Sequence, residues 1–227
     1  MRGINLSARG IAAVKAVVFV VALLPALQLA YQALWDVEAL GANPAETLTR
    51  SLGDWTLRLL LLTLAVTPVR KLLGWPWLAR VRRMLGLYVF FYALLHFTSY
   101  AAFDQVFDFG EILRDIAERP FITVGVAALL LLMPLAATST NGMVRRLGGA
   151  NWVALHRLVY VIAVLGVVHF WMMVKRDVTE PAIYAFILAV LLGYRVWEAQ
   201  RKRRLLQATA AADARRRTAP GRLRARG

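Results

Sequence analysis

The chain has 227 residues, of which 59% are hydrophobic, and a mean hydropathy of +0.56. A soluble domain of this length would not need so many unbroken apolar runs, so these values indicate a membrane protein. The absence of cysteine excludes an iron–sulfur cluster, a thiolate-bound heme and covalent heme attachment through a Cys-x-x-Cys-His motif.

Apolar segments recur along the whole chain. A membrane-spanning helix needs about 20 predominantly apolar residues, and the sequence contains six runs of roughly this length. They predict an all-α membrane protein, a bundle of six transmembrane helices. The runs cover residues 11–34, 55–73, 84–103, 121–138, 152–174 and 182–197.

Charged residues alternate between the connections that join these segments. The second and fourth connections are basic and contain no acid, and the tail is strongly basic, whereas the first, third and fifth connections are acidic. The positive-inside rule therefore predicts that both termini are cytoplasmic. The basic set includes Arg70, Lys71, Arg80, Arg82, Arg83, Arg145 and Arg146, and the acidic set includes Asp36, Glu46, Asp104, Asp108, Glu111 and Asp177.

The net charge of +15 also raises nucleic-acid binding as an explanation. We expect no nucleic-acid partner, because the basic residues lie where membrane topology and anionic lipid headgroups would place them. Residues 1–198 then form the membrane domain. Residues 199–227, which are rich in Ala and Arg, form a basic cytoplasmic tail that is either disordered or a short surface helix.

Three histidines, His96, His156 and His169, fall within the apolar segments. An ionisable ring is costly there unless it has a function, and a neutral imidazole between helices is a natural axial ligand of heme iron. His96 and His169 lie in the outer halves of the third and fifth segments, which run in the same direction. We therefore expect the two rings to share a membrane depth and to ligate one heme. Gly166, one turn before His169, would let a flat macrocycle approach the backbone.

His156 lies toward the inner face, about 20 Å from His169 along a helix. This separation suits a second redox site. The two rings face one pocket only if the helix is irregular or the sites use different neighbours. The inner site also lacks a second histidine, because Arg82 stands 14 positions before His96 where a partner would be expected. A packing role, or contact with a propionate or a quinone, is the alternative for His156.

Arg58 lies near the outer end of the second segment. Two interpretations stay open for its guanidinium. It either extends to the outer headgroups or neutralises a heme propionate at the depth of His96 and His169.

Six short motifs are together similar to those of one bacterial family. They are residues 43–50 (NPAETLTR), 82–88 (RRMLGLY), 92–96 (YALLH), 119–125 (RPFITVG), 138–142 (TSTNG) and 155–160 (LHRLVY). With them the chain resembles the heme-binding membrane subunits of periplasmic protein-methionine-sulfoxide reductase systems, which belong to the ferric-reductase-like transmembrane group. The resemblance extends over about residues 11–197.

The resemblance implies a b-type cytochrome in the bacterial inner membrane, with one heme b or two. Such a subunit takes electrons from quinol and passes them to a periplasmic molybdopterin-containing reductase that repairs oxidised methionine in envelope proteins. His96, His156 and His169 match the family's histidines, whereas Arg82 departs from the two-heme pattern of the related eukaryotic oxidases. FMN is implied by the resemblance only. The chain itself would be an electron-transfer subunit without a catalytic site for methionine sulfoxide.

Ferric reductases and NADPH oxidases also carry a large cytoplasmic nucleotide-binding domain. Only residues 198–227 follow the last segment here, too few for a dinucleotide-binding fold, and no G-x-G-x-x-G motif follows a strand. We therefore expect the electron donor to be a membrane quinol or a separate protein.

Three other interpretations stay open. The chain is a transporter or proton channel with a histidine relay, an assembly scaffold whose histidines only pack, or a ferric-reductase-like cytochrome with another partner. The apolar segments contain no acid, which weakens the transporter interpretation.

Overall fold

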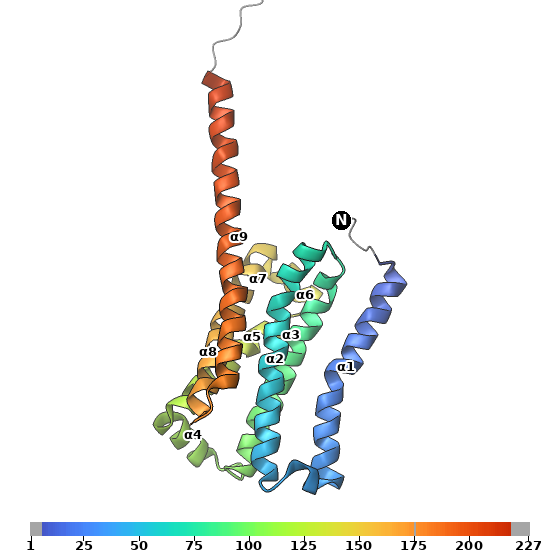
Figure 1. Cartoon of the computed structure of the whole chain (residues 1–227), viewed down its shortest axis with the longest axis vertical. Helices are drawn as coiled ribbons and strands as arrows, with labels where there is room; N and C mark the ends of the chain where they lie inside the picture. The colour runs from blue at the N-terminus through green and yellow to red at the C-terminus, as the bar shows by residue number, and fades with distance from the viewer. Residues whose placement is uncertain (1–5, 175, 219–227) are drawn as a thin grey trace, which may run out of the picture. The chain divides into compact units, whose positions relative to one another are not determined.

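A computed structural model of the protein describes residues 6–174 and 176–218. Every described element is a helix, which confirms the predicted all-α fold (Figure 1). The chain divides into two units, Met1–Leu188 and Ala189–Gly227. The elements are α1 (Ala8–Trp35), η1 (Val37–Leu40), α2 (Pro44–Leu73), α3 (Leu78–Phe103), α4 (Phe109–Glu118), α5 (Pro120–Ala137), α6 (Asn141–Leu147), α7 (Gly149–His156), α8 (Leu158–Met173) and α9 (Thr179–Thr218).

Five of the described helical segments are long and apolar enough to cross a membrane: Ala8–Trp35, Leu78–Phe103, Pro120–Ala137, Gly149–Met173 and Thr179–Ala214. These confirm a multi-pass membrane protein. The second predicted segment is the exception, since α2 has the length to span but carries Asp54, Arg58, Arg70 and Lys71. α2 also buries more residues than the other helices, so protein covers much of its surface. The count of six spans stays a prediction.

The ends of α2 follow from its sequence. The Asn43 side chain accepts a hydrogen bond from the Glu46 amide, and Pro44 occupies the first turn, where a missing N–H costs nothing. Gly74 ends the helix in the left-handed conformation, at φ 67°. α2 then packs along α3, and α5 packs along α8 in the same way. These two helix pairs contain His96, in α3, and His169, in α8.

The fifth predicted segment is not one regular helix. It divides into α7 and α8 at Arg157, which lies in a turn between them. The Arg157 amide donates to Ala154 and the Tyr160 amide donates to Arg157, so the hydrogen bonds at this point join residues three apart. Such tightening changes the rotation of one helix relative to the next. The helical path between His156 and His169 is therefore irregular at Arg157.

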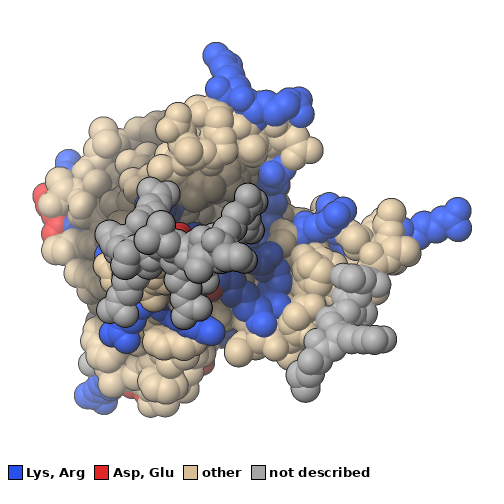
Figure 2. Space-filling view, turned by 90° about the horizontal axis from the view of Figure 1, so that it is seen from above, with Lys and Arg blue, Asp and Glu red and all other residues tan. Residues whose placement is uncertain are grey.

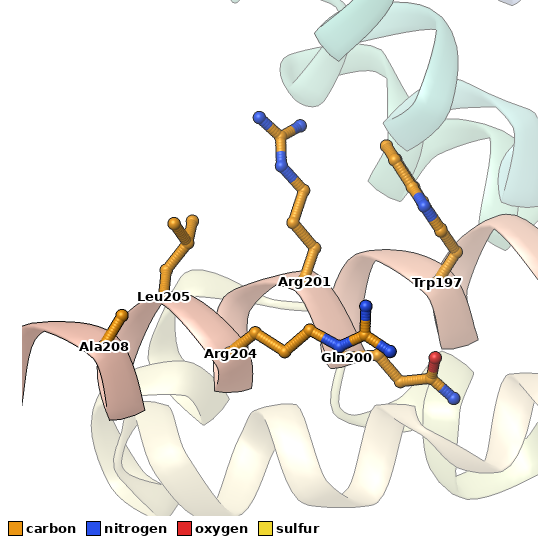
Figure 3. Close-up of a pocket in the computed structure, with 6 residues that line it drawn as sticks. All are labelled: Trp197, Gln200, Arg201, Arg204, Leu205 and Ala208. Atoms are coloured by element: carbon orange, nitrogen blue, oxygen red, sulfur yellow. The ribbon is translucent and has the colours of Figure 1, made fainter.

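Helix α9 includes part of the predicted tail. The helix runs to Thr218 because residues 195–218 contain no Gly or Pro and are rich in Ala, Arg, Leu and Gln, which favour helix. Residues 219–227 lie outside the described part of the chain. A shallow hollow on this helix is shown in Figure 3, and all six residues that line it belong to the second unit. They are Trp197, Gln200, Arg201, Arg204, Leu205 and Ala208.

The connections of the first unit lie at two opposite ends. η1 and α4 are at one end, which we call the acidic end, and α6 and α7 are at the other, which we call the basic end (Figure 1). Figure 2 views the molecule from the latter side, and among charged side chains the visible face shows many more Lys and Arg than Asp and Glu. At the acidic end, Arg50 pairs with Glu46, Arg114 with Glu111 and Arg119 with Asp115.

Candidate functional site

His96 of α3 and His169 of α8 lie together inside the first unit. Their ring centroids are 6.1 Å apart and their planes meet at 77°. Two metal–nitrogen bonds of about 2 Å, each extended by the radius of an imidazole ring, span nearly the same separation. Both side chains are half-buried. The separation of the two rings is therefore compatible with two imidazoles that ligate one metal.

Each of these two rings is oriented by a main-chain carbonyl. His96 Nδ1 lies 2.8 Å from the Thr49 carbonyl oxygen, and His169 Nδ1 lies 2.7 Å from the Phe121 carbonyl oxygen. A carbonyl oxygen only accepts, so the hydrogen-bond geometry assigns the proton to Nδ1 in both rings. In a neutral imidazole the Nε2 lone pair is then available to a metal, and the Nδ1 hydrogen bond increases its donor strength.

A glycine lies against each ring. A Cβ atom built on Gly53 of α2 would be 3.1 Å from Cε1 of His96, and one built on Gly125 of α5 would be 2.9 Å from Cε1 of His169. Gly166 lies elsewhere: a Cβ atom built on it would be 3.5 Å from the Leu57 side chain and 3.9 Å from the Leu60 side chain of α2. Gly166 therefore packs against α2, and its expected role in the approach of a macrocycle stays a prediction.

His156 lies at the basic end and has different neighbours. Its Nδ1 is 3.0 Å from the Trp152 carbonyl oxygen, its Nε2 is 3.5 Å from Ser139 Oγ, and its ring stacks on Trp152 at 3.8 Å. The structure does not bring it to the pair formed by His96 and His169. The two histidine positions therefore use separate surroundings, which is one of the two arrangements that the sequence left open.

Two arginines of α3 border His156. Arg82 and Arg83 are close enough to act on the ring electrostatically. Arg82 donates to Thr67 Oγ1 at 3.5 Å, and Arg83 donates to Asn141 Oδ1 at 2.6 Å while lying over the Trp152 ring at 5.8 Å. No second histidine accompanies His156 among the described residues, which include all three histidines of the chain.

Arg58 is already engaged by neighbouring side chains. Its Nε donates to the Tyr184 hydroxyl at 3.0 Å, its Nη2 lies 3.8 Å from Asp54 Oδ2, and its guanidinium lies 5.1 Å from the centre of the Trp55 ring. The side chain is exposed. These contacts fix the guanidinium on the outside of α2 beside the first turns of α9.

The part of the chain that the structure describes contains no group of three or more His, Cys, Asp or Glu arranged for a metal ion. A bare ion usually takes four or more protein or water ligands. A pair of neighbouring imidazoles suits a metal whose remaining ligands come from elsewhere, as the four porphyrin nitrogens do in heme.

Comparison with known proteins relates this apolar helical bundle to a described family of transmembrane proteins. The family model described as "Ferric reductase like transmembrane component" matches residues 52–167, about half of the chain. The matched region contains His96 and His156. The class of protein is therefore the ferric-reductase-like transmembrane proteins.

Curated relatives narrow the class further. One from Herminiimonas arsenicoxydans is 57% identical over 192 residues, which cover 84% of this chain and 87% of the relative. One from Rhodospirillum rubrum is 57% identical over 187 residues, covering 82% and 89%. One from Azospira oryzae is 54% identical over 191 residues, covering 84% and 81%. Each of them is named as the heme-binding subunit MsrQ of a protein-methionine-sulfoxide reductase, and this chain belongs to that family.

Sequence reasoning missed the carbonyl and glycine partners of the histidines. Gly53 and Gly125 lie in helices that are neighbours of the histidine helices, and a glycine in an apolar helix is a known sign of close helix approach. Nothing in one sequence says which glycine faces which ring, because that depends on how the helices are rotated in the bundle.

Proposed function

We propose that the chain is a b-type cytochrome, with His96 and His169 as the two axial ligands of one heme b. The observation that carries this proposal is the pair of imidazoles 6.1 Å apart, each with Nδ1 on a carbonyl. Two neutral nitrogen donors in an apolar bundle are the donor set of a low-spin heme. When bound, the heme supplies reversible one-electron chemistry.

The protein's own part is to bind and orient this group. The Thr49 and Phe121 carbonyls hold the two rings in one tautomer. Arg58 is the proposed partner of a heme propionate, which would take the place of Asp54 in an ion pair that is long at 3.8 Å. It would offset the cost of a carboxylate at this depth.

The cluster around His156 is proposed as a second cofactor-binding site at the basic end. It offers one imidazole and the guanidinium groups of Arg82 and Arg83. These groups suit the anionic part of a cofactor, either a propionate of a second heme or the phosphate of FMN. Arg82 supports a second heme only in this way, because a guanidinium has no lone pair for iron.

Electrons would enter from the membrane and leave at the acidic end. The orientation follows from the positive-inside rule, which puts both termini and the basic end in the cytoplasm of a bacterial cell, with α2 as a sixth span. Quinol is the proposed donor, and a periplasmic molybdopterin-containing methionine-sulfoxide reductase is the proposed acceptor. His169 lies one turn before the end of α8 at Met173, which leaves a short path to that acceptor.

The experiment that tests the heme assignment is a visible absorption spectrum of the purified protein with a heme-to-protein ratio. A redox-responsive heme band is expected. His96→Ala and His169→Ala should each remove the same spectral component, because each variant leaves the iron with one protein ligand. His156→Ala is the control at a separate site and should keep that component. A wild-type protein without heme would favour a histidine relay or a scaffold instead.

A further inference from the structure

The two histidines of the pair are held by the same local arrangement. On α2, Thr49 provides the carbonyl for His96 and Gly53, four residues later, lies against the ring. On α5, Phe121 provides the carbonyl for His169 and Gly125, again four residues later, lies against the ring. The acceptor and the glycine are therefore one helical turn apart on the same helix face.

The spacing has a direct physical reason. For Nδ1 to reach a carbonyl of the neighbouring helix, the imidazole must lie close to that helix's backbone at the next turn. A side chain there would occupy the position of the ring, since a Cβ at Gly125 would be 2.9 Å from Cε1 and 3.0 Å from Nδ1 of His169. Real Cβ atoms essentially never come within 3.0 Å of another heavy atom of this kind, so the His169 ring would have to move. The hydrogen bond thus requires glycine at this position.

Glycines elsewhere in the described helices do not have this relation to a histidine. A Cβ at Gly86 would meet the Thr63 side chain at 4.0 Å, one at Gly166 would meet Leu57 at 3.5 Å, and one at Gly193 would meet nothing within 4 Å. These are ordinary packing distances or open space. The close contact of glycine with an imidazole is found at both members of the pair, on two different helices.

We propose that Gly53 and Gly125 are positioning residues of the His96–His169 site, which seat each imidazole against a helix turn so that Nδ1 donates to the carbonyl four residues earlier. This inference rests on the proposed function of the pair. A methyl group at either glycine displaces the ring and lengthens the Nδ1 hydrogen bond. The imidazole then donates less electron density to iron, which favours the ferrous state.

The test compares Gly53→Ala and Gly125→Ala with Gly86→Ala, a matched variant in α3 whose Cβ has room. Redox titration of the heme band should show midpoint potentials shifted to more positive values in the first two variants, with an altered low-spin electron paramagnetic resonance signal. The shift should be larger for Gly125→Ala, because its contact is shorter. Gly86→Ala should match wild type. Wild-type potential and signal in both test variants would overturn the inference.

A second comparison separates positioning from general damage to the bundle. In a His96→Met background the ligand has no Nδ1, so adding Gly53→Ala should give no further shift in potential. An equal shift in both backgrounds would mean that the methyl group acts through packing and would overturn the inference. In wild type, nuclear magnetic resonance should show both ligand Nδ1 protons protected from exchange with solvent. Rapid exchange of both protons would contradict the proposal even if the alanine variants did not fold.

These outcomes are distinct from failure of the proposed function. If wild-type protein bound no heme, the assignment of the pair as ligands would fail. If wild type bound heme, and His96→Ala and His169→Ala lost it, the function would stand. The alanine variants and the exchange of the Nδ1 protons would then decide separately whether Gly53 and Gly125 position the two rings.

Discussion

The hydroxyl of Tyr92 donates to the carbonyl oxygen of Ala22 over 2.7 Å. The hydroxyl oxygen of Tyr92 in turn accepts the amide hydrogen of Ala26 at 3.0 Å, so the hydroxyl lies between two groups that would pair with each other in a regular helix. Pro25 stands beside them in α1 and has no N–H of its own. Tyr92 lies in α3 and has no exposed surface. Its hydroxyl therefore supplies hydrogen-bond partners for two backbone groups of α1, those of Ala22 and Ala26.

Tyr92→Phe should destabilise the bundle by about 1–3 kcal/mol, because it removes the acceptor of the part-buried Ala26 amide. The matched control is Tyr88→Phe, which removes a single bond from the Tyr88 hydroxyl to the Phe19 carbonyl oxygen. A carbonyl within a helix still accepts the hydrogen bond of its own helix, so Tyr88→Phe should lose less stability than Tyr92→Phe. Urea or thermal unfolding in detergent measures both. Equal losses in the two variants would contradict the bridging role.

A pH dependence of opposite sign is expected at two carboxylates outside the membrane segments. Partial burial and the charge of Glu46 raise the pKa of Asp104 above its usual value near 3.8. Hydrogen bonds from Thr179 lower the pKa of Asp177. The raised pKa stabilises the fold only at low pH, and this contribution is lost as pH rises through the folded value. The lowered pKa stabilises the fold above about pH 3.8 and is lost as pH falls.

Asp104→Ala should therefore raise the free energy of unfolding at pH 7 by at most about 0.5 kcal/mol, and with it the midpoint of thermal unfolding. This gain in stability should disappear below pH 4. Asp177→Ala should lower the midpoint at pH 7 and have little effect at acid pH. A thermal series from pH 3 to pH 8 measures both variants. Parallel pH profiles for the two variants would contradict the assigned signs.

The sequence predicted the helical class, five of the membrane segments and the proximity of His96 and His169. These follow from apolar length and from direction along the chain, which one sequence records. The rotation of each helix did not follow, because segments that are apolar on every side carry no periodic signal for their buried face. That rotation decides which residues face His96 and His169, so the sequence did not reveal the roles of Gly53 and Gly125 or the break at Arg157. The sequence did not predict α4 either, because this helix lies in a connection of mixed polarity.

The membrane orientation can be tested with single cysteines, since the chain has none of its own. Cysteines in place of Glu46 and Asp108 should react with an impermeant thiol reagent in intact cells. Those in place of Arg80 and Arg145 should react only after lysis, because the positive-inside rule places them in the cytoplasm. Labelling at Arg145 but not at Asp108 in intact cells would reverse the orientation.

The docking surface for the acceptor should be the exposed acids of the acidic end, such as Asp104 and Glu118. Asp115 is unavailable, since it is buried and accepts hydrogen bonds from Tyr100 and Gln105 while pairing with Arg119. This network instead ties α4 to the end of α3 and keeps the surface fixed. Charge contacts of this kind mainly affect the rate of association and weaken with salt.

The proposed direction of electron flow, from quinol to a periplasmic acceptor, can be tested on the purified protein. A quinol analogue should reduce the heme of the purified protein, and oxidised acceptor should then reoxidise it in a step that slows as salt rises. NADH without another protein should reduce the heme only slowly, because no dinucleotide-binding motif is present in the sequence. Stopped-flow absorption at the heme band measures each step, with His169→Ala as the variant that should respond to neither donor. Fast reduction by NADH alone would show that the donor is not a quinol and that the chain has a nucleotide site of another kind.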